Sequence, residues 1–210
     1  MKSLDRKRQA LAIGLAALAG FVDAVGYLSA DGYFVSFMSG NTTRLGVNIA
    51  RTPGLALFPA LLLGSFVCGV TLGAVVSGKS GAWRKPAVLA LVSVLLIGAA
   101  LARGMGVHAA VLALLVLAMG AINNTFQRGG EVTVGLTYMT GALVKLGQAI
   151  GARLLGERRE GAGAWMLLWC GLAGGAVLGA LAFTHLAGAA LWLAGGWAIA
   201  MTAAAGRLPA

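Results

Sequence analysis

Charged residues are scarce in this chain. Only 10% of its 210 residues are charged, and the acidic residues number just 6. A soluble domain carries about 25% charged residues, so this composition excludes an ordinary soluble domain. Hydrophobic residues make up 59% of the chain and are accompanied by 33 glycines. These values predict an integral membrane protein, so we expect the lipid bilayer to be one of its partners.

Histidine and cysteine, two common metal ligands, are also few. The chain has two histidines and two cysteines, and two thiols alone are too few ligands for a structural zinc site. The sequence contains no His–Glu metal cluster, no nucleophile with a base and no Asp-rich phosphate site. We therefore expect no enzymatic activity and no cofactor.

The 16 lysines and arginines could suggest a nucleic-acid partner. Most of them lie in short polar gaps between apolar runs, where positive charge holds loops on the cytoplasmic side of a membrane. We therefore expect no nucleic-acid binding. The basic start of the chain leads into an apolar run of spanning length, which predicts a first transmembrane helix rather than a cleaved signal.

Apolar runs recur along the chain in a regular order. Patches in the two halves match at an offset of 101 to 102 residues, for example Cys68-Gly69 with Cys170-Gly171. This offset predicts an all-α polytopic membrane protein made of two internal repeats, 1–103 and 104–210. Each repeat has three spanning helices and one broken or re-entrant segment. The expected spans are 9–30, 55–77, 86–102, 107–125, 163–184 and 186–205, and the polar segments are 33–51 and 132–152.

The two polar segments carry one motif. Residues 34–46 align without a gap with residues 135–147, which pairs serine with threonine, glycine with glycine and arginine with lysine. The first copy predicts an extended lead-in, a break at Ser39-Gly40 and a short helix over 41–50, roughly 15 Å long. Such broken elements are tolerated in a membrane only when they are buried in protein or line a cavity. The repeated motif is therefore our candidate for the centre of a transport pathway.

The relation between the halves depends on whether the polar segments cross the membrane. If they are re-entrant, each half has three crossings, the second half is inverted and most loop cations share one side. If they cross, eight spans and parallel halves follow, and the three cations of the 78–85 gap lie outside. The bias of positive loops toward the cytoplasm favours the inverted repeat. Both arrangements put the N- and C-termini in the cytoplasm.

We expect the substrate to bind at the starts of the two short helices. A helix N-terminus presents unpaired N–H groups and the positive end of the helix dipole. Glycine allows close approach, hydroxyls add donors and a cation adds charge, so two such ends facing each other would suit an anionic group. The candidate substrate-binding residues are Asp23, Ser39, Gly40, Asn41, Thr42, Thr43, Arg44, Asn124, Thr140, Gly141 and Lys145.

Asp23 stands out because it is a carboxylate inside the first apolar span. Such a group is costly in a membrane unless it faces protein or water, so it is a candidate for proton or cation coupling. Asn124 occupies its place in the second repeat, which leaves one titratable carboxylate. In the alternative interpretation, Asp23 lies near the helix end and only caps or pairs with a neighbour.

Several functions fit these observations. The first is a transporter or channel for a small solute, with a preference for an anion. The second is a proton- or cation-coupled carrier of a small neutral or aromatic metabolite, with Asp23 as the coupling residue. The third is a non-transporting scaffold or assembly partner. In a purely structural interpretation of the motifs, they are polar helix breaks packed against small residues, and Arg44 and Lys145 extend to an interface. The Gly-x-x-x-Gly patterns at 69–73 and 171–175 suit either a homodimer or close packing within one protomer.

The same residues resemble a known family. The stretch 20–27 with its Asp23-Ala24 pair, followed by the Ser-Gly-Asn-Thr-Thr run 39–43, is similar to the signature of the YoaK family of small bacterial inner-membrane proteins. The resemblance covers nearly the whole chain. It implies a polytopic protein of the bacterial inner membrane, usually with six predicted spans, and implies no substrate. Ser39 stands where the family commonly has threonine, a change that keeps the hydroxyl.

Overall fold

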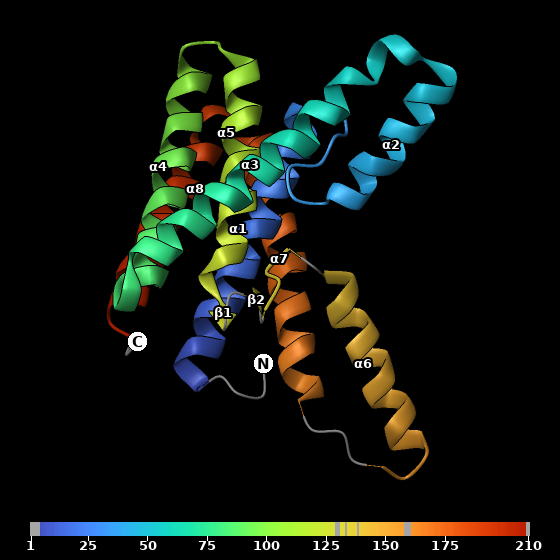
Figure 1. Cartoon of the computed structure of the whole chain (residues 1–210), viewed down its shortest axis with the longest axis vertical. Coiled ribbons are helices and arrows are strands. Elements are labelled where there is room, and N and C mark those ends of the chain that lie inside the picture. Colours follow the sequence, from blue (N-terminus) through green and yellow to red (C-terminus); the bar gives the residue numbers. More distant parts are fainter. Residues whose placement is uncertain (1–4, 129–130, 133, 138, 158–160, 209–210) are drawn as a thin grey trace.

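The computed structural model describes residues 5–128, 131–132, 134–137, 139–157 and 161–208. Within these residues the chain forms eight α-helices and one β-hairpin whose strands have two residues each (Figure 1). The helices are α1 (Arg6–Ser29), α2 (Met38–Arg51), α3 (Leu57–Lys79), α4 (Arg84–Gly104), α5 (His108–Ile122), α6 (Met139–Leu154), α7 (Ala162–Leu186) and α8 (Ala190–Gly206). The hairpin pairs β1 (Gln127–Arg128) with β2 (Glu131–Val132).

Five helical segments are long and apolar enough to cross a membrane. They contain α1, α3, α4, α5 and α7. The remaining apolar helix, α8, has 17 residues, or roughly 25 Å at 1.5 Å per residue. The expected all-α, multi-pass membrane fold is therefore confirmed.

The central bundle pairs helices from the first half of the chain with helices from the second half. α1 packs along α7, α3 packs along α5, and α4 contacts both α5 and α8. The two short polar helices lie outside this bundle, α2 beside α3 and α6 beside α7 (Figure 1). Each short helix therefore forms a hairpin with the helix that follows it.

Glycines allow the closest of these contacts. A Cβ atom at Gly175 would overlap the carbonyl oxygen of Ala17 in α1, and one at Gly73 would lie 2.8 Å from the carbonyl oxygen of Ala121 in α5. Both Gly-x-x-x-Gly patterns are therefore used for close packing inside one protomer, the second of the two roles expected for them. Cys68, next to the first pattern, is a free thiol.

The first polar segment consists of a non-helical stretch, residues 30–37, called the lead-in here, followed by the short helix α2. Asp31 and Gly32 have positive φ angles of 47° and 82°, which turn the chain sharply away from the end of α1. The lead-in then enters the molecule, and α2 returns toward the end of the bundle where α3 begins (Figure 1). The predicted break at Ser39-Gly40 is wrong in position, since the helix already begins at Met38. No side chain caps this helix start, and Phe37 occupies the N-cap position.

The second polar segment has the same form at the opposite end of the bundle. Residues 134–137 are non-helical, and α6 runs from Met139 to Leu154 toward the end at which α7 begins (Figure 1). The two short helices therefore start near the middle level of the bundle and run in opposite directions (Figure 1). This arrangement brings both motif starts to one level of the bundle.

Candidate functional site

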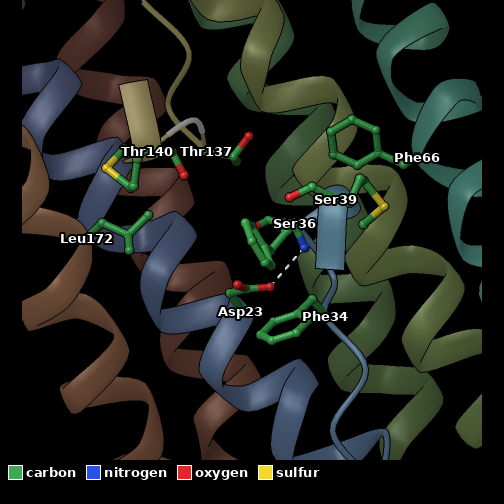
Figure 2. Close-up of a pocket in the computed structure, with 11 residues that line it drawn as sticks. Asp23, Phe34, Ser36, Ser39, Phe66, Thr137, Thr140 and Leu172 are labelled. Atoms are coloured by element: carbon green, nitrogen blue, oxygen red, sulfur yellow. Dashed lines mark hydrogen bonds between the residues drawn. The ribbon is translucent and has the colours of Figure 1, made fainter. Parts of the chain in front are cut away.

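A cavity of about 470 Å³ lies between the start of α2 and the start of α6. Figure 2 shows Ser36 and Ser39 of the first motif on one side, Thr137 and Thr140 of the second on the other, and Asp23 between them. Ser36 and Thr137 are buried, whereas Ser39 and Thr140 are exposed. The cavity therefore has hydroxyls at both its base and its rim. Its volume is in the range of small-molecule sites.

Asp23 ties α1 to the first lead-in. Its Oδ1 atom accepts hydrogen bonds from the backbone N–H groups of Val35 at 3.0 Å and Ser36 at 2.8 Å. Because the lead-in is not helical, these donors have no partner in their own segment, and a carboxylate satisfies two of them at once. Asp23 also lines the cavity. It is thus both a support for the lead-in and the acidic group of the site.

In the second half, an asparagine makes the corresponding contact. The hydroxyl group of Thr137 lies 3.2 Å from Oδ1 of Asn123. The residue expected here, Asn124, faces elsewhere: its Nδ2 atom donates to the carbonyl oxygen of Val70 in α3 at 3.0 Å. The reason is geometric, since Asn123 and Asn124 follow each other in a 3-10 turn and their side chains diverge. Of these two asparagines, Asn123 is therefore the one that contacts the second motif, and it does so through the Thr137 side chain rather than the backbone.

Asn41 holds the lead-in from the other side. Its Oδ1 accepts from the backbone N–H of Phe34 at 3.1 Å, and its Nδ2 donates to the carbonyl oxygen of Phe34 at 2.7 Å. It is the one buried residue that α2 contributes. The amide side chain thus acts as a strand partner for a single residue, and neither serine nor alanine could make both bonds.

Replacing Asn41 with alanine is expected to destabilise the protein by about 2–4 kcal/mol, since two backbone groups of Phe34 lose their partner in a partly buried place. Thr42→Ala is the matched control. The Thr42 hydroxyl is exposed and bonds only to the carbonyl oxygen of Met38 in its own helix. Chemical unfolding in detergent should separate the two variants, and equal stabilities would contradict the proposed support.

The remaining hydroxyls and glycines of the motifs lie around the cavity rather than in it. Thr43 is exposed and bonds to the carbonyl oxygen of Ser39, one turn back in α2. A Cβ atom at Gly40 would lie 2.6 Å from the Phe37 ring and 3.1 Å from the Phe34 ring. Gly141 has open space around it. Gly40 therefore has a packing role that its counterpart lacks.

The two motif cations are held away from the cavity by aromatic rings. The guanidinium of Arg44 lies 4.5 Å from the centre of the Tyr33 ring and reaches toward the carbonyl oxygen of Asp31, at the turn that ends α1. The ammonium of Lys145 lies 3.8 Å from the centre of the Trp165 ring in α7. Both contacts are cation–π pairs, which stabilise packing.

The lining of the cavity is therefore acidic, hydroxylated and apolar. Its one charged residue among those described is Asp23, and the start of α2 and the start of α6 add the positive ends of two helix dipoles. The expectation of a site built on Arg44 and Lys145 is not matched by this geometry. Their positions follow from nearby aromatic residues, which the motif alignment did not include.

Several residues that line the cavity are not among the binding residues expected from the sequence. Six of them belong to the aligned motif but not to the candidate binding residues, namely Phe34, Ser36, Phe37, Met38, Thr137 and Met139. A signal for them existed, because large apolar side chains flank the hydroxyls in both copies of the motif. The other lining residues, Phe66 of α3 and Leu172 of α7, carried no signal, since only the packing of distant helices brings them to the cavity.

Comparisons with known proteins agree with the membrane fold. A family model described as a protein of unknown function (DUF1275) matches residues 11–204. A UPF0700 transmembrane protein of Rhizobium meliloti (strain 1021) is 38% identical over 211 residues, which cover 98% of this chain and 91% of the relative. The UPF0700 transmembrane protein YoaK of Bacillus subtilis (strain 168) is 30% identical over 156 residues, which cover 70% of this chain and 68% of the relative. No solved structure matches the chain significantly. The resemblance expected from the Asp-Ala and Ser-Gly-Asn-Thr-Thr motifs is thus confirmed, and the chain belongs to the YoaK-like DUF1275 family of transmembrane proteins of unknown function.

Proposed function

We propose that this protein is a proton-coupled carrier of a small neutral solute with an aromatic or other apolar part. The observation that carries the proposal is the position of Asp23, which lines a cavity between two broken segments together with hydroxyls from both. A carboxylate inside a membrane-spanning helix is retained where it binds a substrate or relays a proton. Broken segments meeting at mid-depth are the usual setting of such sites in secondary transporters.

The apolar part of the solute follows from the rest of the lining. The rings of Phe34, Phe37 and Phe66 and the side chains of two methionines surround the polar groups. An aromatic or otherwise flat apolar solute would contact these rings, while its polar groups would bond to the hydroxyls and to Asp23. This lining favours a carrier of a neutral solute over a transporter of an anion.

We further propose that the two halves are inverted repeats. The pairing of α1 with α7 is answered by that of α5 with α3, and α2 beside α3 is answered by α6 beside α7. α1 and α5 run in opposite directions in the bundle (Figure 1). Helices in corresponding positions thus make corresponding contacts with reversed direction, which supports an inverted relation.

The proposed orientation in the bacterial inner membrane rests on charge. One end of the bundle collects the start of α1, the α3–α4 connection, the end of α6 and the end of α8 (Figure 1). The terminal cations of these helices include Lys79, Arg84, Arg153 and Arg207. The opposite end carries fewer, such as Arg103 at the end of α4. The positive-inside bias makes the first end, with both termini, cytoplasmic.

The anion alternative keeps one observation in its favour, the two helix N-termini at the cavity. The anion site expected from the sequence also uses the cation of the motif, Arg44. Replacing Arg44 with alanine is expected to leave ligand binding unchanged and to lower stability by about 1–2 kcal/mol through loss of the contact with Tyr33. Arg51→Ala, which removes an exposed cation at the end of α2, is the control.

The measurement is ligand-dependent thermal stabilisation of the purified protein against a panel of neutral aromatic metabolites and small anions. A ligand at about 100 times its Kd stabilises by roughly 2.7 kcal/mol, which is easily seen. Stabilisation by neutral aromatic compounds in both wild type and Arg44→Ala supports the proposal. Stabilisation by an anion that Arg44→Ala abolishes would instead establish the anion site, and no stabilisation by any compound would favour the scaffold.

A further inference from the structure

We propose that a second cavity, lined by α1 and α7, is an outer subsite that gives the solute a second way into the central cavity, and that the ring of Phe34 separates the two cavities. This second way lies on the side of Asp23 and away from the exposed rim at Ser39 and Thr140. The inference rests on the proposed function, because it assigns a route to the same solute. The solute class is the same: a neutral compound with an aromatic or flat apolar part and a hydrogen-bond donor for Asp23.

The second cavity has a volume of about 430 Å³. Its outer wall is formed by Tyr27 and Leu28 near the end of α1, and by Ala176 and Ala180 of α7. Tyr27 and Leu28 are exposed, at 39% and 45%. α1 and α7 touch closely here, since a Cβ atom at Gly20 would overlap the carbonyl oxygen of Leu172, and the small alanine side chains leave the cavity alongside this contact. The cavity therefore reaches the surface close to the end of the bundle at which α1 ends.

The two cavities share one wall. Asp23, Phe34 and Leu172 line both of them. Asp23 reaches this wall from α1, Leu172 from α7, and Phe34 from the lead-in. A solute in either cavity would therefore meet the same carboxylate, and the barrier between the cavities consists of two apolar side chains.

Aromatic rings lead from one cavity to the other. The Tyr27 and Phe34 ring centres are 5.0 Å apart, and the Phe34 and Phe37 ring centres are 5.2 Å apart. Tyr27 lines only the outer cavity, Phe37 only the central one, and Phe34 both. These separations are typical of favourable ring contacts, so a flat apolar solute can exchange one ring partner for the next along the way.

The geometry separates a fixed backbone from a side chain that can turn. Asn41 holds both backbone groups of Phe34, so the lead-in stays in place. The Phe34 side chain is only partly buried and has open cavity volume on both sides. Rotation of this ring would join the two cavities without any movement of a helix. A Cβ atom at Gly40 would lie 3.1 Å from the Phe34 ring, so a side chain at this position would restrict that ring.

The test measures access to the central cavity with a cationic methanethiosulfonate reagent, so it needs no knowledge of the solute. In a background with Cys68→Ser and Cys170→Ser, the buried Ser36 is replaced by cysteine, and its modification rate is measured with and without Phe34→Ala. We expect Phe34→Ala to raise the rate about tenfold or more, because a gate rather than the chemistry limits access. Phe34→Leu, which keeps an apolar side chain, should give a smaller increase and serves if the alanine variant does not fold.

A second pair of substitutions tests the route. Ala176→Trp fills the outer cavity and should cancel the increase caused by Phe34→Ala. Val177→Trp is the matched control, since Val177 is the next residue, is 60% exposed and lies outside both cavities. The inference is overturned if Phe34→Ala and Phe34→Leu leave the rate within about twofold of the parent, the range expected without a gate. It is also overturned if the two tryptophan variants behave alike.

These outcomes are independent of those for the proposed function. A compound that stabilises the protein while Phe34→Ala leaves access unchanged would contradict the route and keep the carrier. An increase in access with no stabilising compound in the panel would keep the gated route and contradict the carrier.

Discussion

Replacing Asp23 with asparagine is expected to leave a folded protein whose solute binding no longer depends on pH. The amide oxygen of asparagine can still accept the two backbone hydrogen bonds from Val35 and Ser36, so the lead-in stays in place. The amide cannot bind or release a proton in the range where a carboxyl group does. Coupling between the proton and the solute is therefore lost, while the cavity keeps its shape.

Replacing Asp23 with alanine should have a second and different effect. Both N–H groups then lose their acceptor, at a cost of roughly 1–3 kcal/mol for each buried donor left unsatisfied. We expect Asp23→Ala to be clearly less stable than Asp23→Asn, which should be close to wild type. Thermal unfolding separates the two variants, and the pH dependence of ligand stabilisation then separates Asp23→Asn from wild type.

The pair of variants distinguishes the support role of Asp23 from its role in coupling. If Asp23→Asn keeps the pH dependence of the wild type, the coupling group lies elsewhere and the carrier proposal loses its central residue. If both variants are equally unstable, the charge itself is needed for the fold. That result would favour the structural interpretation of Asp23.

Replacing Gly175 with leucine is expected to prevent the chain from folding into a stable bundle. A Cβ atom alone at this position would overlap the carbonyl oxygen of Ala17 and lie 2.8 Å from its Cα atom. The obstacle is backbone, which cannot turn aside as a side chain can. The contact lies in the middle of the α1–α7 pair, so separating these helices would also open the cavity beside Asp23.

The expected size of the effect is large. Inserting atoms into a well-packed core typically costs about 1–3 kcal/mol and more when the backbone must shift. Gly175→Ala should already fall in this range, although alanine favours a helix over glycine by about 1 kcal/mol. Gly175→Leu should exceed it, and little folded protein should be recovered after extraction from the membrane.

The neighbouring glycine provides the matched control. Gly174 is exposed, and a Cβ atom there would meet nothing within 4 Å. Gly174→Ala and Gly174→Leu should therefore be as stable as wild type or slightly more stable. The yield of monodisperse protein and its unfolding temperature are the measurements. Equal behaviour of the two glycine series would mean that α1 and α7 are not packed at this register.

Much of the fold can be predicted from the sequence because the bilayer acts on each segment separately. A run of apolar residues long enough to cross the membrane forms a helix, whatever its neighbours are. The expected spans 9–30 and 163–184 therefore agree closely with α1 and α7. The short polar helices were recognisable for the same reason, since a polar segment such as 33–51 cannot form an ordinary lipid-facing span.

Which residues belong to the site depends on the directions in which their side chains point, and a sequence alignment does not contain these directions. Asn123 and Asn124 are adjacent in the sequence, yet one contacts Thr137 and the other contacts α3. Arg44 lies at the right place in the motif for an anion site, yet Tyr33 and the end of α1 hold it outside the cavity. A helix turns by about 100° per residue, so a small difference in register decides which side chain faces the cavity.

The sequence by itself thus determined the membrane class, the order of the segments and the two polar motifs, because hydropathy and segment length are local properties. Only the tertiary structure decided that the motifs share one cavity, that Asp23 is its charged group and that Phe66 and Leu172 complete its wall. These features depend on α1 packing against α7 and α3 against α5. The physical reason is that close glycine contacts set the register of these helix pairs, and the register sets what each side chain faces.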